Sequence, residues 1–300
     1  HIDEVLAMDL VDVEAVKAAK FKVVVDGVNS SGGIIVPKLL ELMGVEVVEL
    51  YCDPTGHFPH NPEPLKEHLT DISNLVVAEK ADLGIVVDPD VDRLAFISED
   101  GEMFGEEYTL VAVADYVLSK TPGNTVSNMS SSRALRDVTN KHNGTYEASA
   151  VGEVNVVELM KKNNAVIGGE GNGGIIYPTS HYGRDSMVGI ALFLTHLANK
   201  KMKVSELRAS YPEYYMSKNK IELTPQIDVD AILEAMTDRY QADEIQTIDG
   251  VKIDFADNWV HLRKSNTEPI IRIYTEAATQ QIADDLAQKI INEIKVIAGI

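Results

Sequence analysis

The chain has 300 residues, of which 45% are hydrophobic and 25% charged, so it can bury the cores of two or three domains. Its formal net charge of −20, without a run of lysine or arginine, argues against nucleic acid as a partner. The single cysteine, Cys52, excludes a disulfide framework. Because neither a signal peptide nor a membrane-spanning stretch is evident, we expect a cytoplasmic protein that does not bind membranes.

Residues 1–100 predict an α/β domain that ends in an acidic loop. The pattern predicts a buried strand over 21–26, a tight loop over 27–33, a helix over 34–43 and a parallel strand over 45–50. Two further strands, over 82–87 and 94–98, flank the acidic loop. Open α/β sheets bind ligands at the carboxyl ends of their strands, so the loop that follows residue 87 is a candidate site.

Residues 101–212 predict a second α/β domain, which begins with a helix over 108–118. Its other expected elements are short strands that begin near Val126, Tyr146 and Ala165, and helices over 133–142, 155–162 and 185–199. Residues 210–218 are predicted to connect this domain to the last one.

Residues 219–300 predict a smaller α+β domain with an antiparallel sheet. The expected elements are strands over 221–223, 259–263 and 270–276, helices over 228–240 and from 279 onward, and a hairpin that turns at Asp249-Gly250. The predicted fold class is therefore α/β, with two consecutive domains that have largely parallel mixed sheets before the α+β domain.

The acidic loop DPDVDR carries Asp88, Asp90 and Asp92 at alternate positions. Side chains two apart on an extended chain share one side, so we expect these carboxylates to converge on one cation. Three carboxylates with room for water and a phosphate oxygen favour Mg²⁺. A Ca²⁺-binding loop is one alternative, but Arg93 stands where such a loop needs a glycine. A solvated turn that binds no metal is the other alternative.

The stretch GGEGNGG places Glu170 and Asn172 among five glycines between two predicted strands. Glycines let the backbone approach a ligand, while the carboxylate and the amide can bind hydroxyl groups, which suits a sugar. A glycine-rich hairpin with two solvated tips explains the same residues.

The stretch RKSNTEP supplies a guanidinium and short polar donors at the end of a strand. These groups predict an anion cradle, which a turn can complete with backbone N–H groups. Arg272, on the next strand, either supports the cradle or lies on an exposed strand face. The residues of this predicted phosphate-binding loop are Arg263, Ser265, Asn266 and Thr267.

Three other features are predicted to be structural. The loop over 27–33 lacks the glycine spacing of a dinucleotide-binding turn and the Gly-Lys-Ser/Thr ending of a P-loop. His60 lies in PHNPEP without a preceding serine, and the prolines there indicate a rigid connector. Cys52 fits a small, partly buried thiol without chemistry.

Taken in this order, DPDVDR, GGEGNGG and RKSNTEP resemble the α-D-phosphohexomutase family, and PHNPEP resembles that family's proline-rich stretch. The resemblance implies an isomerase that moves phosphate between the 1 and 6 positions of a hexose or hexosamine through a 1,6-bisphosphate. It assigns Mg²⁺ to the three aspartates, phosphoryl stabilisation to Arg93, sugar hydroxyls to Glu170 and Asn172, and the non-reacting phosphate to the predicted phosphate-binding loop with Arg272. The phosphosugar would be the substrate.

The sequence also departs from the family. The family's phosphoserine, in a Ser-His-Asn-Pro loop of a first domain, has no match, so we expect three domains that are inactive without that domain as partner. Gly174 stands where many members have a histidine that acts as acid or base, and His181 or Arg184 could substitute. The GEGNGG form favours the phosphoglucosamine mutase and phosphomannomutase branch. A phosphosugar-binding module without catalysis is the alternative, and the oligomeric state, a homodimer included, stays open.

Overall fold

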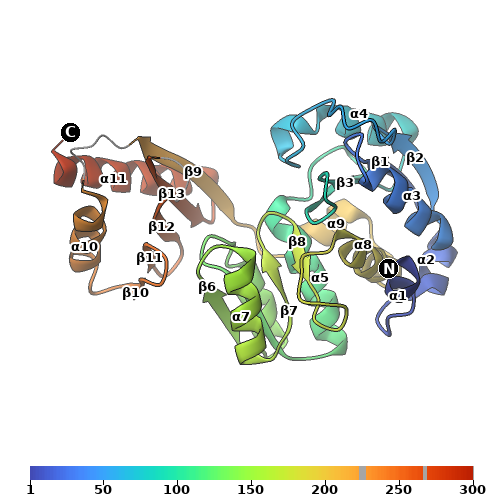
Figure 1. The fold of residues 1–300 in the computed structure, drawn as a ribbon. Coiled ribbons are helices and arrows are strands. Elements are labelled where there is room, and N and C mark those ends of the chain that lie inside the picture. Colours follow the sequence, from blue (N-terminus) through green and yellow to red (C-terminus); the bar gives the residue numbers. More distant parts are fainter. Residues whose placement is uncertain (223–227, 266–268, 300) are drawn as a thin grey trace. The chain divides into compact units, whose positions relative to one another are not determined.

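The computed structural model describes residues 1–222, 228–265 and 269–299 (Figure 1). The chain divides into two compact units: unit 1 comprises His1–Ala148 and Gly152–Pro212, and unit 2 comprises Ser149–Val151 and Glu213–Ile300. Within the described ranges, no helix combines the length and the apolar character needed to cross a membrane.

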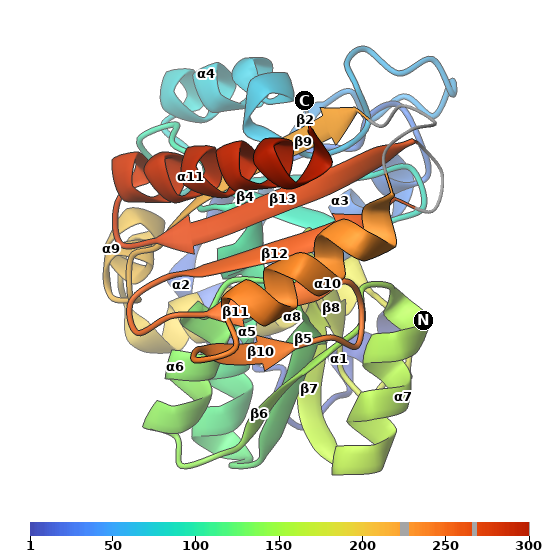
Figure 2. The same ribbon diagram turned by 90° about the vertical axis from the view of Figure 1, so that its left-hand side faces the viewer.

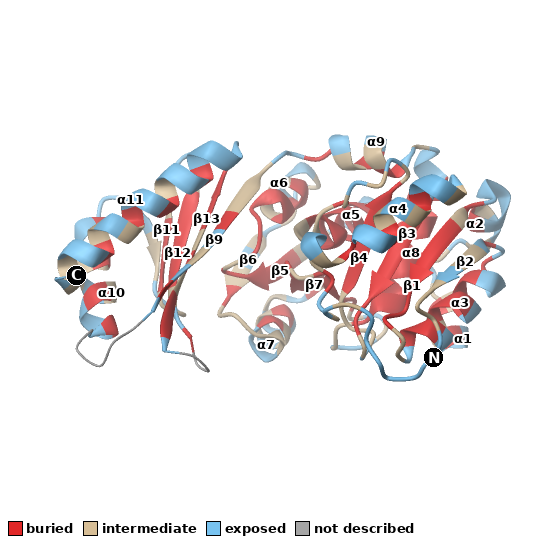
Figure 3. Cartoon of the chain, turned by 90° about the horizontal axis from the view of Figure 1, so that it is seen from above, coloured by how far each residue is buried: buried red, intermediate tan, exposed pale blue. Residues whose placement is uncertain are grey.

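The first sheet of unit 1 has the strand order β2-β1-β3-β4, with β1 parallel to both neighbours and β4 antiparallel to β3. All residues of β3 and β4 are buried (Figure 3), as expected for strands with packed layers on both faces. The elements of this part are β1 (Lys22–Asp26), α3 (Gly32–Leu42), β2 (Glu46–Leu50), the 3-10 helix η1 (Lys66–His68), α4 (Thr70–Glu79), β3 (Leu83–Val87) and β4 (Leu94–Ser98).

The second sheet of unit 1 has the order β6-β5-β7-β8, in which β5 and β7 are parallel and β8 is antiparallel to β7. Its elements are α5 (Glu106–Lys120), β5 (Asn124–Asn128), α6 (Ala134–Lys141), β6 (Tyr146–Ser149), α7 (Glu153–Asn163), β7 (Ala165–Glu170), β8 (Gly174–Ile176), α8 (Ser186–Lys200) and α9 (Val204–Ala209).

Two buried helices, α5 and α8, join the two sheets into one core. Each contacts β4 of the first sheet, and α5 contacts β7 while α8 contacts β8 of the second. Phe96 of β4 stacks on Phe193 of α8 with ring centroids 3.8 Å apart. Two short helices at the start of the chain, α1 (Ile2–Leu6) and α2 (Val13–Ala19), also pack against α8. The shared core therefore includes β3 and β7 in one compact unit.

Unit 2 is an antiparallel sheet with the order β10-β11-β12-β13-β9. Helices α10 (Val229–Arg239) and α11 (Gln280–Ala298) lie along one face of the sheet (Figure 2), where aliphatic side chains form the core. Asp228 and Thr279 cap these helices by accepting from backbone N–H groups three residues on. The strands are β9 (Tyr215–Glu222), β10 (Glu244–Gln246), β11 (Val251–Asp254), β12 (Trp259–Lys264) and β13 (Ile270–Ala277).

The predicted fold class is confirmed, and two local predictions are corrected. Residues 215–218, predicted as a connector, belong to β9, which pairs along all of β13; its polar residues fit an edge strand with one exposed side. Helix α3 begins at Gly32, inside the predicted loop. Helices α1 and α2 were not predicted. Leu223, predicted as a strand residue, lies outside the described residues.

Candidate functional site

The three aspartates of the acidic loop converge at the carboxyl end of β3. Asp88, Asp90 and Asp92 each offer one carboxylate oxygen, and these oxygens all lie within 4.8 Å of one another. The carboxylates do not converge for the predicted reason, which was that alternate side chains of an extended chain share one side. The loop is instead a tight turn in which Val91 has a φ of 60°. Asp88 Oδ1 holds this turn by accepting from the backbone N–H groups of Asp92 and Arg93, both at 3.0 Å.

The loop over residues 27–33 is hydrogen-bonded to the acidic loop. Ser30 and Ser31 donate their hydroxyls to the carbonyl oxygen of Pro89 at 3.0 and 2.8 Å. Both serines come from the segment that the sequence predicted to be structural, and this contact is consistent with that role. Nothing in the spacing of the residues indicates the contact.

The electrostatics of the acidic loop suit a bound cation. Burial, together with the negative charges of Asp92 and Asp90, raises the pKa of Asp88 to about 7, and burial raises the pKa of Asp92. A divalent cation would remove the cost of crowding three carboxylates, and oxygen-only donors match Mg²⁺ or another hard ion. The residues present therefore fit a Mg²⁺ site.

Arg93 lies beside the aspartates but is already paired. Its Nη1 donates to Glu63 Oε1 at 2.9 Å, and its Nε lies 3.8 Å from Asp88 Oδ2. Glu63 belongs to the PHNPEP connector, which therefore touches the acidic loop through this pair. Arg93 would have to exchange Glu63 for a phosphate oxygen in order to act on a phosphoryl group.

Glu170 and Asn172 lie at the carboxyl end of β7. Glu170 is 6% exposed; its Oε1 accepts from Asn128 Nδ2 at 3.0 Å and from the backbone N–H of Gly152 at 3.2 Å. Asn172 Oδ1 accepts from the backbone N–H of Gly174. These hydrogen bonds hold both side chains more firmly than expected for two solvated side chains at the tip of a hairpin. A sugar that binds here would therefore contact oxygen atoms of fixed orientation.

Arg184 joins the glycine-rich loop to the acidic loop. Its Nη2 donates to Asp92 Oδ2 at 2.5 Å and its Nη1 to Glu170 Oε2 at 3.3 Å, while its Nε lies 3.3 Å from Glu153 Oε2. The backbone N–H of Leu94, at the start of β4, also donates to the carbonyl oxygen of Gly173. Two of the three predicted loops therefore meet within unit 1.

The side chain of Arg184 also fills the space next to Gly174. A Cβ atom built on Gly174 would lie 2.4 Å from Arg184 Cδ. A side chain at position 174 and the observed arginine conformation are therefore mutually exclusive. His181, the other predicted substitute, points instead toward Asp185, to which its Nε2 is hydrogen-bonded at 2.9 Å.

Sequence reasoning missed Asn128 and Ser131, which hold the glycine-rich loop. Besides the bond from Asn128 to Glu170, Ser131 Oγ accepts from the backbone N–H of Gly171 at 3.0 Å. Asn128 is the last residue of β5, the parallel neighbour of β7, and Ser131 lies three residues further on. The rule that carboxyl ends of parallel strands share one edge could have found them.

The predicted phosphate-binding loop belongs to unit 2. Arg263 and Arg272 lie directly opposite each other on β12 and β13, and Arg263 Nε lies 3.3 Å from Asp249 Oδ2. Ser265 is 7% exposed, and its backbone N–H donates to the carbonyl oxygen of Ile270. Two neighbouring guanidinium groups form a basis for binding an anion. Asn266 and Thr267 lie outside the described residues.

His60 and Cys52, which the sequence analysis predicted to be structural, both lie in partly buried places. His60 Nε2 lies 2.9 Å from Asp26 Oδ2, which is buried at the end of β1. Burial raises the pKa of the Cys52 thiol to about 11, which keeps it protonated and unreactive at neutral pH.

Sequence comparisons place the whole architecture in one family. Residues 1–101 match the model of phosphoglucomutase/phosphomannomutase α/β/α domain II, residues 105–215 that of α/β/α domain III, and residues 219–293 that of the C-terminal domain. The chain therefore belongs to the phosphoglucomutase/phosphomannomutase family, the α-D-phosphohexomutases, as its motifs predicted.

Individual relatives agree with this family. A phosphoglucomutase/phosphomannomutase of Thermococcus kodakarensis is 38% identical over 91% of this chain and 60% of its own length. A probable phosphoglucosamine mutase of Methanopyrus kandleri is 33% identical over 98% of this chain and 65% of its own length. The crystal structure of a family protein from Burkholderia thailandensis superposes with a TM-score of 0.80 at 26% identity, over 95% of this chain and 63% of its own. The chain thus spans less than two thirds of the length of these relatives.

Proposed function

We propose that this chain forms the greater part of a Mg²⁺-dependent phosphohexomutase that interconverts the 1-phosphate and 6-phosphate of a hexosamine, most simply glucosamine. The observation that carries the proposal is the meeting of the acidic loop and the glycine-rich loop through Arg184, which contacts both Asp92 and Glu170. A relative named as a probable phosphoglucosamine mutase supports this substrate. Mannose and glucose phosphates are the alternatives, since Glu170 would face hydroxyls that these sugars largely share.

In the proposed reaction the protein mainly positions groups and balances charge. Mg²⁺ held by Asp88, Asp90 and Asp92 would neutralise negative charge on the phosphoryl group. Arg93 would release Glu63 and donate to that group, because its guanidinium already lies beside Asp88. Glu170, held by its three donors, would accept hydrogen bonds from sugar hydroxyls, with Asn172 beside it.

The non-reacting phosphate would be bound by the predicted phosphate-binding loop, with Arg272 as a second cation. Binding the non-reacting phosphate would hold the sugar in the orientation that the transfer of the other phosphate requires. The phosphoserine that the family uses would come from a further domain of the same protein. The sugar 1,6-bisphosphate would be the intermediate, and the protein would bind no nucleic acid.

The test is a mutase assay on the full-length gene product with the 1-phosphates of glucosamine, mannose and glucose. We expect turnover with glucosamine 1-phosphate to exceed that with the other two. Phosphosugar binding without turnover by the full-length protein would favour a binding module instead.

Replacing Asp90 with Asn tests the Mg²⁺ assignment. Asp90 is exposed, so the variant should fold normally while Mg²⁺ binding, measured by calorimetry, weakens at least tenfold because one charged oxygen ligand is lost. Asp100→Asn, in the exposed turn after β4, is the matched control and should bind Mg²⁺ as the wild type does. If Ca²⁺ outcompetes Mg²⁺ in the wild type, the site is a calcium site and the assignment fails.

A further inference from the structure

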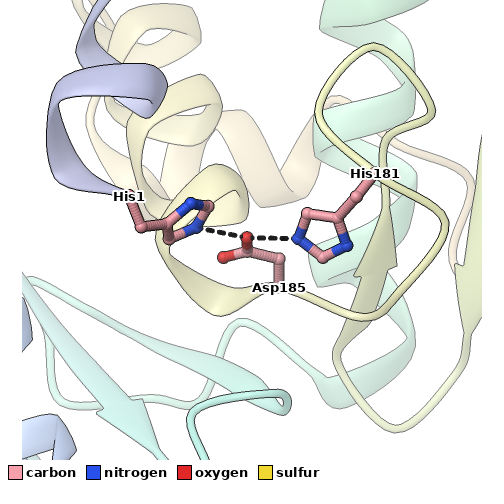
Figure 4. Close-up of side chains that lie close together, drawn as sticks. All are labelled: His1, His181 and Asp185. Atoms are coloured by element: carbon pink, nitrogen blue, oxygen red, sulfur yellow. Dashed lines mark hydrogen bonds and ion pairs between the residues drawn. The ribbon is translucent and has the colours of Figure 1, made fainter.

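Two histidines and one aspartate meet at the start of α8, apart from the residues assigned to the proposed reaction (Figure 4). His1 Nε2 lies 2.6 Å and His181 Nε2 lies 2.9 Å from the same oxygen, Oδ2 of Asp185. The three donor atoms all lie within 4.8 Å of one another. The two imidazoles reach this oxygen from different parts of the fold, since His1 precedes α1 and His181 follows β8.

We propose that His1, His181 and Asp185 form a binding site for a transition-metal ion such as Zn²⁺. Two imidazole nitrogens and one carboxylate oxygen are a donor set that Zn²⁺ accepts, with water in the fourth position. Bond lengths near 2.1 Å in a tetrahedral site separate the donor atoms by about 3.4 Å. The observed separations of 2.6 and 2.9 Å need to open by less than 1 Å.

The carboxylate of Asp185 is fixed in the orientation that this site requires. Its Oδ1 caps α8 by accepting from the backbone N–H groups of Met187 and Val188 at 2.9 and 3.1 Å. Oδ2 is thereby turned toward the two imidazoles and is shared between them. Because the backbone holds Oδ1, the third ligand is positioned before any ion arrives.

Glu4 places a carboxylate near the second ring nitrogen of His1, where metal-bound histidines often have an acceptor. Its Oε2 lies 3.6 Å from His1 Nδ1. A neutral imidazole that donates to Asp185 through Nε2 has no proton on Nδ1. When Nε2 binds a metal, the ring proton lies on Nδ1 and faces Glu4, so Glu4 stabilises the metal-bound tautomer relative to that neutral ring.

The site is open to solvent and joins separate elements. The side chains of His1 and His181 are 37% and 46% exposed, so an ion and its water can enter and the rings can move apart. An ion there would tie the start of α1 to the first turn of α8. Its ligand Asp185 directly follows Arg184, which contacts Asp92 and Glu170. The inference does not depend on the proposed mutase activity.

The test is Zn²⁺ binding by the chelator-treated protein in excess Mg²⁺, which occupies the acidic loop. We expect calorimetry to find one Zn²⁺ per chain, and Co²⁺ to give visible d–d absorption in the wild type. His181→Gln retains a donor for Asp185 and should weaken Zn²⁺ binding by about 100-fold or more and remove the Co²⁺ bands. Asp185→Asn, which keeps an oxygen for the helix cap, should do the same.

Two controls locate the site. His57→Gln, at an exposed histidine in a loop of unit 1, and Asp90→Asn, in the acidic loop, should both retain Zn²⁺ binding. Zn²⁺ should raise the Tm of the wild type but not of His181→Gln. Equal Zn²⁺ affinity in the wild type and His181→Gln, or its loss in Asp90→Asn, would overturn the proposal. Either result would leave the mutase assay to decide the proposed function separately.

Discussion

Arg184 is the residue on which the candidate site of unit 1 depends most. Its side chain is 14% exposed and lies among the carboxylates of Asp92, Glu153 and the buried Glu170. The arginine balances charges that would otherwise repel one another in a partly buried place. A charge that loses its partner in such surroundings is more costly than the pair itself is favourable.

Replacing Arg184 with Ala should therefore lower the free energy of unfolding by about 3 kcal/mol at pH 7. Urea titration followed by far-UV circular dichroism measures the change. Arg136→Ala is the control, because Arg136 is 37% exposed and lies 4.0 Å from its partner Asp137, so its loss should cost less than about 0.5 kcal/mol. Equal losses in the two variants would mean that Arg184 does not balance this cluster.

Gly174→Ala tests the competition for space beside Arg184. The added Cβ would lie 2.4 Å from Arg184 Cδ and 3.1 Å from Asn172 Oδ1, so the arginine must leave its place. We expect a loss of about 1–3 kcal/mol in the wild-type background. Since the clash vanishes once the arginine is truncated, Gly174→Ala and Arg184→Ala together should cost less than their sum. Strict additivity in urea unfolding would contradict the steric argument.

At the scale of elements, strand β12 contains a histidine whose charge state the fold controls. His261 is 2% exposed and its Nε2 lies 2.7 Å from the carbonyl oxygen of Asp249, which belongs to the turn between β10 and β11. Burial lowers the pKa of His261 from 6.5 to about 4. Folding thus requires the neutral ring, while the unfolded chain binds a proton below pH 6.5.

Stability that depends on this histidine is complete above pH 6.5 and is lost as the pH falls toward 4, because the unfolded state then binds more protons. Between pH 7 and pH 5, the free energy of unfolding of the wild type should fall by about 2 kcal/mol more than that of His261→Gln. The only tryptophan, Trp259, lies buried in the same strand, and His261 is the only histidine after residue 212, so tryptophan fluorescence isolates this effect. Parallel pH profiles of the two proteins would contradict it.

The sequence predicted most elements because their hydrophobic periods are clear. Buried strands such as β3 are unbroken apolar runs, and α11 has a strong amphipathic pattern with Thr279 at its cap. Strand β9 was partly missed because its polar side chains alternate with few apolar ones. Helices α1 and α2 were missed because each is only one or two turns long, and their apolar residues face α8.

At the scale of the whole molecule, the site could be predicted only in parts. The acidic, glycine-rich and phosphate-binding motifs lie far apart in the sequence, and family resemblance linked them before any geometry was known. The contacts of Arg184 and the supporting hydroxyls of Ser30 and Ser31 depend on loops that meet only after packing. No local pattern contains that information.

The proposed substrate has two kinds of groups, and the two units are proposed to bind different ones. Glu170 of unit 1 is assigned to hydroxyls and Arg263 of unit 2 to the phosphate. Replacing Arg263 with Ala should weaken binding of glucosamine 6-phosphate by about 1.5–3 kcal/mol, the usual size of a charge-assisted hydrogen bond, and leave binding of glucosamine unchanged. Glu170→Gln should weaken the binding of both ligands, since hydroxyls are common to them.

Titration calorimetry with both ligands measures these differences. Lys264→Ala is the control for the loss of one positive charge, because Lys264 is the exposed neighbour of Arg263 on β12 and should change phosphate binding by less than 1 kcal/mol. If Arg263→Ala weakens both ligands equally, Arg263 is not a phosphate ligand. If it weakens neither, unit 2 does not bind the substrate through this loop. Only a loss confined to the phosphorylated sugar agrees with a division of recognition between the two units.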